Sequence, residues 1–392
     1  MKISILKKFE DFESIFKISV EHYVYHRYGV HMEISWQKRS WIDRLIGLHH
    51  PNTYLCNPDI NTIFKADADK IIFTPAWSQY GRSSSFTGLL LRRIYLTLST
   101  SNLLMGLFCP LQFSVKNDVF SDQTVCFAGG LSKIKIFNYT SFEVVNIHKG
   151  NFPSSFLVNE ISFRCSNQRS YILPLIWFND SSYCERLIEK ADPLYYGYDE
   201  LNDFYITKAF QYLQELFFSD YKEYKFEDYL EILLLQIFEF SPLFSDSLFS
   251  RIEQVYQELK IHYEGREVFV GRSHGDLSLG NMLIENDELM LIDWERTKHR
   301  AYGYDLFTYS FESRRNLTKF DEYISVFIDL DDDFIKQIFP RLAENLGGAD
   351  LHMYFYLYLL EEIIYICEES VSFNITVPHT RLMSISNYFR CV

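Results

Sequence analysis

The spacing of apolar residues divides the chain into a strand-rich part and a helix-rich part. Between about residues 119 and 190, short apolar runs separated by turn residues predict strands, with one helix beginning near Ser155. The predicted strands are 124–127, 133–136, 142–147, 171–178 and 183–188. After residue 190, apolar residues recur at three-and-four spacing, which is typical of helices. The predicted helices are 201–218, 226–240, 247–259, 334–346 and 353–369. Strands followed by helices predict an α+β chain with two lobes.

The first 118 residues predict mixed structure that contains helices. Residues 74–88 predict a loop that leads into a helix, and they lack the Gly-Lys-Ser/Thr ending of a phosphate loop. The run 86–108 is the most apolar in the chain, but Arg92 and Arg93 interrupt it near its middle. We therefore expect a buried helix here and no transmembrane segment, with peripheral membrane contact as the alternative.

Composition and charge narrow the class of protein. The 392 residues carry a formal charge of −14, so the chain has no overall field that would favour nucleic acid or anionic lipid. Its seven cysteines show no metal-binding spacing, which favours reduced thiols in a cytoplasmic protein. Residues 1–16 contain acidic residues where a secretory signal would continue with apolar ones.

One segment carries most of the candidate chemistry. His274-Gly275-Asp276 is followed by Asn281, and a predicted hairpin then leads to Asp293. Because a hairpin returns the chain to its starting point, we expect Asn281 and Asp293 near its open end, close to Asp276. Two carboxylates and an amide at one place suit phosphoryl transfer, which needs positioning and charge neutralisation. Asn281 and Asp293 would bind Mg²⁺, Asp276 would orient an acceptor hydroxyl and take its proton, and His274 would brace the loop.

This pattern resembles a known superfamily. His-Gly-Asp, an Asn five residues after the Asp, an apolar strand and Ile-Asp-Trp-Glu are similar to the motifs of aminoglycoside phosphotransferases and choline kinase-like proteins, which are themselves similar to protein kinases. The resemblance covers about residues 120–310. It implies a bilobal protein-kinase-like fold with a small antiparallel sheet in a nucleotide-binding lobe (119–190), a mainly helical catalytic and acceptor-binding lobe (191–392), and an N-terminal extension (1–118) that helps select the acceptor. It also implies that Asp305 is a buried carboxylate that steadies the catalytic loop.

The resemblance further implies a nucleotide site in the strand-rich lobe. The turn that contains Gly129, Gly130 and Ser132 would pass over the phosphates. Ile188 and Glu189 would present backbone groups to adenine. Glu160, on the helix of this lobe, would pair with a lysine that binds the phosphates.

The position of that lysine depends on the register of the strands. Strands of the family usually carry it where Asn146 or His148 stands in this chain. Lys149 fills the role if the register shifts by one residue, and we assign it on that basis. Lys133 or Lys135, on the preceding strand, is the alternative.

Together these features predict an ATP- and Mg²⁺-dependent phosphotransferase that acts on a hydroxyl group of a small molecule or saccharide. The alternatives are a nucleotide-binding pseudokinase that regulates a partner, and a protein kinase. Glu361 and Glu362 lie within the apolar stretch 353–367; helical periodicity favours a face turned to solvent, and contact with an acceptor is the alternative.

Overall fold

The structure is a computed structural model, and it describes residues 2–46, 53–80, 86–102, 104–188, 192–193, 200–311, 350–373, 382 and 385. The chain forms two compact units. The first contains residues 1–202 and 282–295, and the second contains residues 203–281 and 296–392. The predicted helix 334–346 lies outside the described residues.

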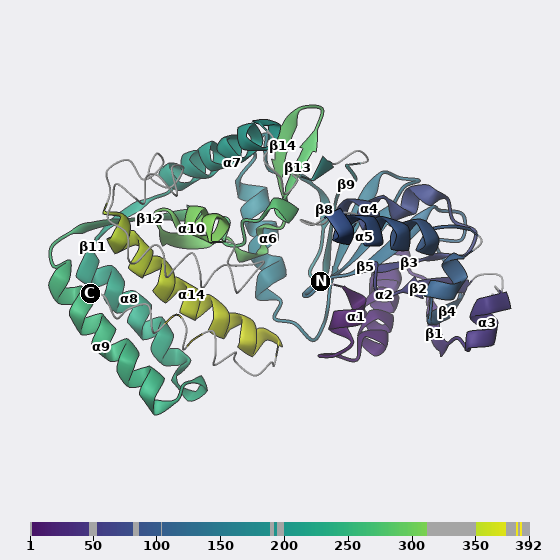
Figure 1. The fold of residues 1–392 in the computed structure, drawn as a ribbon, viewed down its shortest axis with the longest axis horizontal. Helices are drawn as coiled ribbons and strands as arrows, with labels where there is room; N and C mark the ends of the chain where they lie inside the picture. The colour runs from purple at the N-terminus through teal and green to yellow at the C-terminus, as the bar shows by residue number, and fades with distance from the viewer. Residues whose placement is uncertain are drawn as a thin grey trace. The chain divides into compact units, whose positions relative to one another are not determined.

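A nine-stranded antiparallel sheet organises the first unit (Figure 1). Its strands are β1 (Glu33–Lys38), β2 (Thr53–Asn57), β3 (Thr62–Lys65), β4 (Leu111–Lys116), β5 (Val125–Gly129), β6 (Lys133–Asn138), β7 (Glu143–His148), β8 (Leu175–Phe178) and β9 (Ser182–Arg186). They lie in the order β1-β4-β2-β3-β5-β6-β7-β9-β8. The sheet is larger than predicted because β3 pairs with β5, through Ile63 with Phe127 and Phe64 with Cys126. The strands before residue 119 therefore extend the same sheet.

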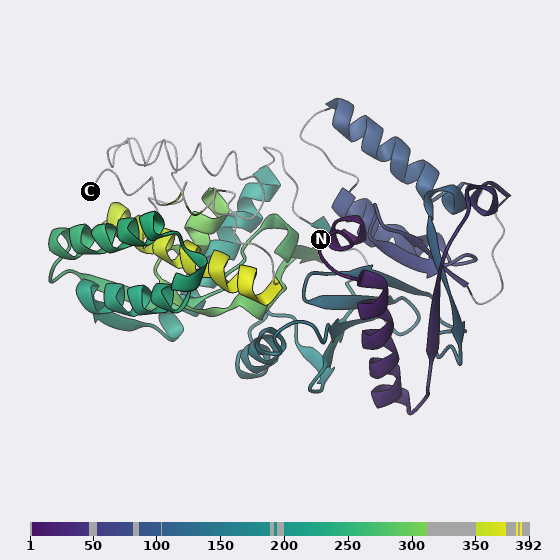
Figure 2. The same cartoon turned by 90° about the horizontal axis from the view of Figure 1, so that it is seen from below.

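Both faces of this sheet are covered by apolar side chains. Along β2, Tyr54 and Cys56 join one core and Leu55 joins the other, as the alternation of a strand requires. The helices of this unit are α1 (Ile3–Leu6), α2 (Phe12–Tyr28), α3 (Trp41–Ile46), α4 (Thr74–Tyr80), α5 (Phe86–Ser99) and α6 (Ser155–Ser166), with 3₁₀ turns η1 (Lys70–Phe73) and η2 (Met105–Phe108). Figure 2 shows α2 on one side of the sheet and α5 on the other.

Two predictions for the N-terminal region are wrong. Residues 74–80 form helix α4, although they were expected in a loop. Helix α5 is not buried, because Leu91 is 67% exposed and among its described side chains only Leu96 and Ser99 are buried. Among the described residues, no helix is long and apolar enough to cross a membrane.

The predicted hairpin is confirmed. Strand β13 (Met282–Glu285) pairs with β14 (Glu288–Leu291), and β10 (Asp192–Pro193) pairs with β13. The two turn residues, Asn286 and Asp287, have φ of 50° and 64°, values that suit the tight hairpin turn favoured by the twist of antiparallel strands.

Helices dominate the second unit. They are α7 (Glu200–Ser219), α8 (Phe226–Glu239), α9 (Asp246–His262), α10 (Tyr304–Ser310) and α14 (Leu351–Phe373), with 3₁₀ turns η3 (Ser241–Leu243) and η4 (Leu279–Asn281). The turn η5 (Trp294–Arg296) lies where the chain passes from the first unit to the second. A small sheet has the order β11 (Lys222–Lys225), β12 (Glu267–Ser273), β15 (Lys298–Ala301). The α+β prediction, an antiparallel sheet followed by a mainly helical part, is confirmed.

Helix α14 buries two carboxylates that were expected to face solvent. Glu361 is 2% exposed and Glu362 is fully buried. Glu361 accepts hydrogen bonds from the Tyr229 hydroxyl and from the Ala301 backbone N–H, the second at 2.8 Å. The Tyr304 hydroxyl donates to Glu362 at 2.6 Å. Fixed donors on neighbouring elements thus make an inward orientation possible, and periodicity within one helix does not contain that information.

Candidate functional site

The turn between β5 and β6 is too tight for a side chain at Gly130. The Gly130 N–H donates to the Lys133 carbonyl oxygen at 2.7 Å, and a Cβ on Gly130 would lie 2.7 Å from that same oxygen. A Cβ on Gly129 would lie 3.0 Å from atoms of Ile3, Leu6 and Phe12. Gly130 therefore permits the turn itself, whereas Gly129 permits close packing against the N-terminal helices.

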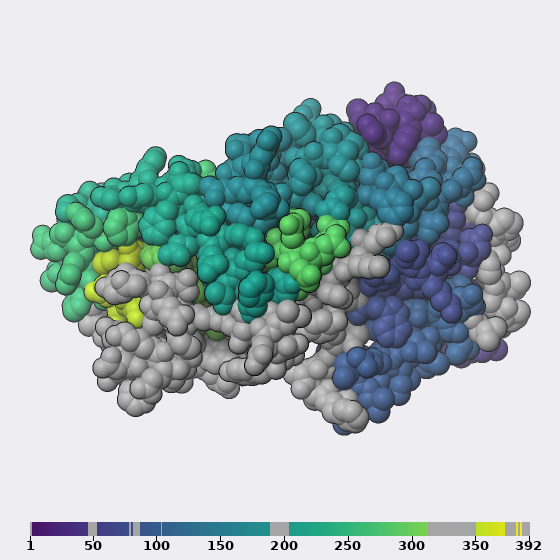
Figure 3. Space-filling view, turned by 90° about the horizontal axis from the view of Figure 1, so that it is seen from above, coloured from purple at the N-terminus to yellow at the C-terminus, as the bar shows by residue number. Residues whose placement is uncertain are grey.

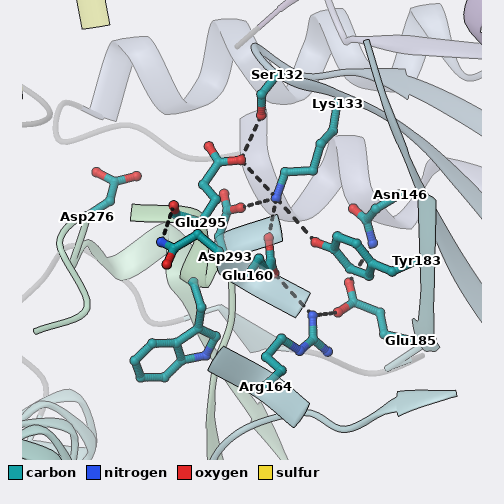
Figure 4. Close-up of polar contacts among 12 residues, drawn as sticks. Ser132, Lys133, Asn146, Glu160, Arg164, Tyr183, Glu185, Asp276, Asp293 and Glu295 are labelled. Atoms are coloured by element: carbon teal, nitrogen blue, oxygen red, sulfur yellow. Dashed lines mark hydrogen bonds and ion pairs between the residues drawn. The ribbon is translucent and has the colours of Figure 1, made fainter. Parts of the chain in front are cut away.

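Lys133 begins β6 directly after this turn and lies among three carboxylates. Its ammonium nitrogen is 2.7 Å from Glu160 Oε2, 2.8 Å from Asp293 Oδ1 and 3.1 Å from Glu295 Oε2 (Figure 4). It also donates to the Tyr183 hydroxyl at 3.2 Å. The Lys133 residue is only 4% exposed, so these interactions are poorly screened by water.

The charges of this cluster are mutually dependent. Burial by itself would lower the pKa of Lys133, but the neighbouring Asp293, Glu160 and Glu295 outweigh it and hold that pKa well above its ordinary value. Burial would likewise raise the pKa of Glu160, and Lys133 with Arg164 reverses the shift and holds it below its ordinary value. Both partners therefore remain charged at neutral pH.

A second layer of polar contacts fixes Glu160 in place. Arg164, one helical turn further along α6, donates to Glu160 Oε1 at 3.1 Å and lies 2.7 Å from Glu185 Oε2. Asn146 on β7 donates to Glu185 Oε1 at 3.1 Å. The carboxylate that holds Lys133 is thus itself held by a fully buried guanidinium, which restricts the position of the ammonium group.

Ser132 and Glu295 connect the turn to the end of the hairpin segment. The Ser132 hydroxyl donates to Glu295 Oε2 at 2.7 Å. On the backbone of the same residue, the Glu295 carbonyl accepts from the Asn159 side-chain amide at 2.9 Å. Sequence reasoning missed Glu295, although it stands two residues after Asp293 in Ile-Asp-Trp-Glu and that spacing could have suggested it.

Asp293 has an unusual backbone conformation. Its φ is 68°, in the left-handed region that aspartate tolerates better than most residues. The next residue, Trp294, is fully buried, stacks on Phe163 with ring centroids 4.6 Å apart, and donates its indole N–H to the Leu291 carbonyl at 2.9 Å. The anchored tryptophan keeps Asp293 in the strained conformation, a feature that occurs often at functional sites.

The carboxylates of this cluster fit a hard divalent cation. Oxygen atoms of Glu160, Asp293 and Glu295 all lie within 4.8 Å of one another. Oxygen donors of this kind are those that Mg²⁺ prefers. Glu160 is committed to Lys133 and Arg164, whereas the side chain of Asp293 is 26% exposed, so Asp293 is the better ligand.

Lys149, to which the sequence analysis assigned the phosphate-binding role, lies elsewhere. Its ammonium nitrogen is 2.5 Å from Glu10 Oε1 and its side chain is fully buried. The lysine that pairs with Glu160 is Lys133, the alternative on the preceding strand. In the β6–β7 register Lys133 lies opposite His148 and Lys135 lies opposite Asn146, so all four residues share one sheet face, and a residue shifted by one, Lys149, does not.

The His-Gly-Asp loop belongs to the second unit and is held by Asp305. The Asp305 carboxylate accepts the backbone N–H groups of His274 and Gly275 at 2.7 and 2.8 Å. Gly275 has φ of 86°, and a Cβ there would lie 2.2 Å from the Arg296 carbonyl oxygen. The loop therefore requires glycine at this position, and Asp305 lies where the resemblance places a bracing carboxylate.

Contacts within the loop orient Asp276. The Asp276 backbone N–H donates to His274 Nδ1 at 3.3 Å, and His274 is fully buried. The side-chain amide of Asn281 donates to the Asp276 backbone carbonyl at 2.8 Å and to its Oδ2 at 3.4 Å. The structure thus brings His274, Asp276, Asn281 and Asp305 together in one braced loop.

The remaining predicted residues concern adenine. Ile188 is buried in a small cluster with Leu173 and Met290, and Leu283 packs against it. Glu189 lies outside the described residues. In the first unit, therefore, the structure groups Ser132, Glu160 and Asp293 around Lys133.

Comparisons with known proteins place the chain beside two groups of kinases. No protein-family model and no curated protein matches the sequence. Among solved structures, it is similar to a thermostable mutant of an aminoglycoside phosphotransferase in a ternary complex with ADP and hygromycin B, with 14% identity and a TM-score of 0.46 over 69% of this chain and 94% of that one. It is also similar to a choline kinase from Cryptosporidium parvum Iowa II (13%, 0.45, 70% and 90%) and to one from Streptococcus pneumoniae (13%, 0.41, 70% and 91%).

Proposed function

We propose that this chain is an ATP- and Mg²⁺-dependent phosphotransferase that transfers the γ-phosphate to a hydroxyl group of a small molecule or saccharide. The observation that carries the proposal is the buried Lys133–Glu160 ion pair beside Asp293. Phosphoryl transfer of the kinase type requires a lysine held by a glutamate and an aspartate that binds the metal. The residue types at the loop, Asp276 and Asn281, supply the other groups that this chemistry needs.

Lys133 would bind the phosphates of ATP. Its three carboxylate contacts keep it charged, and Glu160 with Arg164 behind it keeps the ammonium group in place. The Gly130 N–H is already hydrogen-bonded to the Lys133 carbonyl within the turn. The Ser132 hydroxyl, which donates to Glu295, would donate to a phosphate oxygen instead when ATP is bound.

Asp293 and Asn281, which flank the β13–β14 hairpin in sequence, would bind Mg²⁺. When bound, Mg²⁺ neutralises charge on the phosphate oxygens during transfer. Asp293 is prepared for this role by its φ of 68°, which the buried Trp294 maintains. Asn281 is positioned by its hydrogen bonds to Asp276.

Asp276 would orient the acceptor hydroxyl for in-line attack and accept its proton. His274 accepts the backbone N–H of Asp276, and Asp305 accepts those of the two residues before it, so both act on Asp276 through the loop backbone. They are positioning residues. Small molecules and saccharides as acceptors follow from the resemblance of the motif, and residues 1–118 would contribute to the choice among them.

The experiment measures ADP release by the full-length chain with Mg·ATP and a panel of hydroxylated metabolites and saccharides. We expect acceptor-stimulated release by the wild type and a loss of at least about a hundredfold in Asp276→Ala, because a positioned base contributes that much. Nucleotide binding, measured by calorimetry, should be retained in this variant.

A pseudokinase would bind nucleotide and show no release in either protein, and that result would overturn the proposal. A protein kinase would transfer radiolabel from γ-labelled ATP to protein and never to a small acceptor. The paired Lys133 argues against the pseudokinase, since a charged lysine held by a glutamate is a group that phosphoryl transfer needs.

A further inference from the structure

Helix α5 presents an exposed apolar face, which no other described residue of its unit covers. Leu90, Leu91, Ile94 and Leu98 are 50%, 67%, 47% and 38% exposed. At 3.6 residues per turn these four side chains fall within about 100° around the helix axis. The helix is attached to its unit near its C-terminal end, where Leu96 joins the core with Cys109 and Phe73. Figure 2 shows α5 standing off the sheet, and Figure 3 shows its residues, in blue, on the outer surface.

A second exposed apolar element, helix α3, lies beside the 3₁₀ turn η2, which α5 also contacts. Trp41, Ile42 and Leu45 on α3 are 61%, 63% and 63% exposed. Both α3 and α5 contact η2. We call the seven exposed residues on these two helices the α3–α5 surface. Isolated exposed apolar residues are common, but here seven lie on two helices that both contact η2, and exposed apolar residues grouped in this way are typical of interaction sites.

The segment that contains α5 has a charge opposite to that of the whole chain. Residues 70–117 contain no aspartate or glutamate, and their five basic residues are Lys70, Arg82, Arg92, Arg93 and Lys116. The complete chain carries −14, so its entire excess of negative charge lies in other segments. Arg92 and Arg93 are exposed in the middle of α5, and the Arg44 guanidinium lies 5.1 Å from the Trp41 ring on α3. Helix α5 thus combines an exposed apolar face with two arginines and no acidic residue, whereas α3 carries Asp43 beside Arg44.

We propose that the α3–α5 surface binds the face of a lipid bilayer that contains anionic phospholipids. An amphipathic helix with leucine and isoleucine on one face and arginine beside it lies in the membrane interface, with its apolar face among the acyl chains. Tryptophan favours the same depth, and basic residues are attracted to anionic head groups. A second copy of the chain on this surface would bring the two sets of arginines together, which favours lipid as the occupant.

The test is flotation of the full-length chain with phosphatidylcholine vesicles, with and without phosphatidylglycerol. We expect binding that requires the anionic lipid and weakens at high salt. The variant Leu90→Ser/Leu91→Ser/Ile94→Ser should lower the partition coefficient by about a hundredfold, because it removes the inserted side chains. Arg92→Gln/Arg93→Gln should lower it by about tenfold. These side chains are largely exposed, so the variants should unfold at the same temperature as the wild type.

The matched control is Leu235→Ser/Ile261→Ser, which removes two exposed apolar side chains (58% and 76%) from α8 and its neighbour α9. It should float like the wild type. Absence of wild-type binding, or equal loss in the control and the α5 variant, overturns the proposal. Sedimentation without vesicles supplies the remaining outcome: an oligomer that the α5 substitutions dissociate would make a second copy of the chain the occupant.

Discussion

Two buried lysines of the first unit occupy opposite electrostatic situations. Lys133 is surrounded by three carboxylates and a tyrosine hydroxyl, and the carboxylates hold its pKa above the ordinary value against the effect of burial. Lys149 has one carboxylate, Glu10, and burial keeps its pKa below the ordinary value in spite of that partner. Lys149 also lies 5.8 Å from the rings of Phe12 and Phe152.

The difference separates a lysine suited to phosphates from one suited to packing. Around Lys133 the negative charges exceed the positive one, so a phosphate and its metal ion can exchange places with part of the cluster. Lys149 and Glu10 form a single ion pair beside the rings of Phe12 and Phe152. If either partner bound another group, the charge of the other would remain buried without a partner. Burial alone, which both lysines share, does not distinguish them.

The largest expected effect is on catalysis. Lys133→Met should lower acceptor-stimulated ADP release by about a thousandfold, because the phosphates lose their cationic contact. Lys133→Arg keeps the charge among the carboxylates and should fold like the wild type, yet it misplaces the donor and should be nearly as slow. Lys149→Met is the matched control, and release per folded molecule should be unchanged. Loss of activity in Lys149→Met, with activity kept in Lys133→Met, would reverse the assignment.

The next effect is on stability and concerns the closed pair. Lys149→Met leaves the Glu10 carboxylate without its partner in a site where its side chain is 10% exposed, and should lower the free energy of unfolding by about 4 kcal/mol. Glu10→Gln/Lys149→Met removes both charges and should recover most of that loss. Urea denaturation measures both. If the double variant is as unstable as the sum of the single ones, the two side chains do not act as a pair.

The buried carboxylate of Glu361, on which burial outweighs the charges of Arg300 and Lys298, extends the comparison. Burial raises the pKa of Glu361 to about 7, and the hydrogen bonds from Tyr229 and Ala301 oppose that shift only in part. The folded state therefore binds this proton more tightly than the unfolded state, whose pKa is near 4.5. Stability from this group is complete below that value and is lost as the pH rises to about 7, by about 3 kcal/mol. Denaturation at several pH values should show this slope in the wild type and not in Glu361→Gln.

The smallest effect concerns the turn. Ser132→Ala removes the hydrogen bond to Glu295 and should lower the free energy of unfolding by about 1 kcal/mol. Ser141→Ala is the control, since its hydroxyl also donates to a glutamate, Glu143, but at an exposed position. Its thermal unfolding should match that of the wild type. Equal shifts in the two variants would show that burial of the Ser132 contact contributes nothing.

Local pattern was sufficient for the parts of the molecule that are local. The hairpin, the helices from α7 to α9 and the strands β5 to β7 follow from periodicity and turn residues, and so does the order of strands and helices. The grouping of His274, Asp276, Asn281 and Asp305 could be anticipated because a motif of fixed spacing carries most of it.

Contacts across strands and helices could not be read in this way. Whether Lys133 or Lys149 meets Glu160 depends on the register between β6 and β7, in which Lys133 lies opposite His148. The partner of Lys149, Glu10, is 139 residues away in the sequence. The burial of Glu361 could not be predicted either, since its hydrogen-bond donors, the Tyr229 hydroxyl and the Ala301 N–H, belong to distant segments of the chain. The prediction that α5 is buried was wrong because an apolar composition does not say whether another element covers the helix.

The pairing of β3 with β5 has a practical consequence. A shortened chain that begins at residue 119 would keep the motif residues but expose the backbone N–H and C=O groups of β5 along a new sheet edge. It would also remove α1 and α2 from the core that contains Val125 and Phe127. An uncovered edge next to exposed apolar side chains is a template for strand addition between molecules, so such a fragment should aggregate. We therefore expect the first 118 residues to prevent aggregation by covering the edge strand β5.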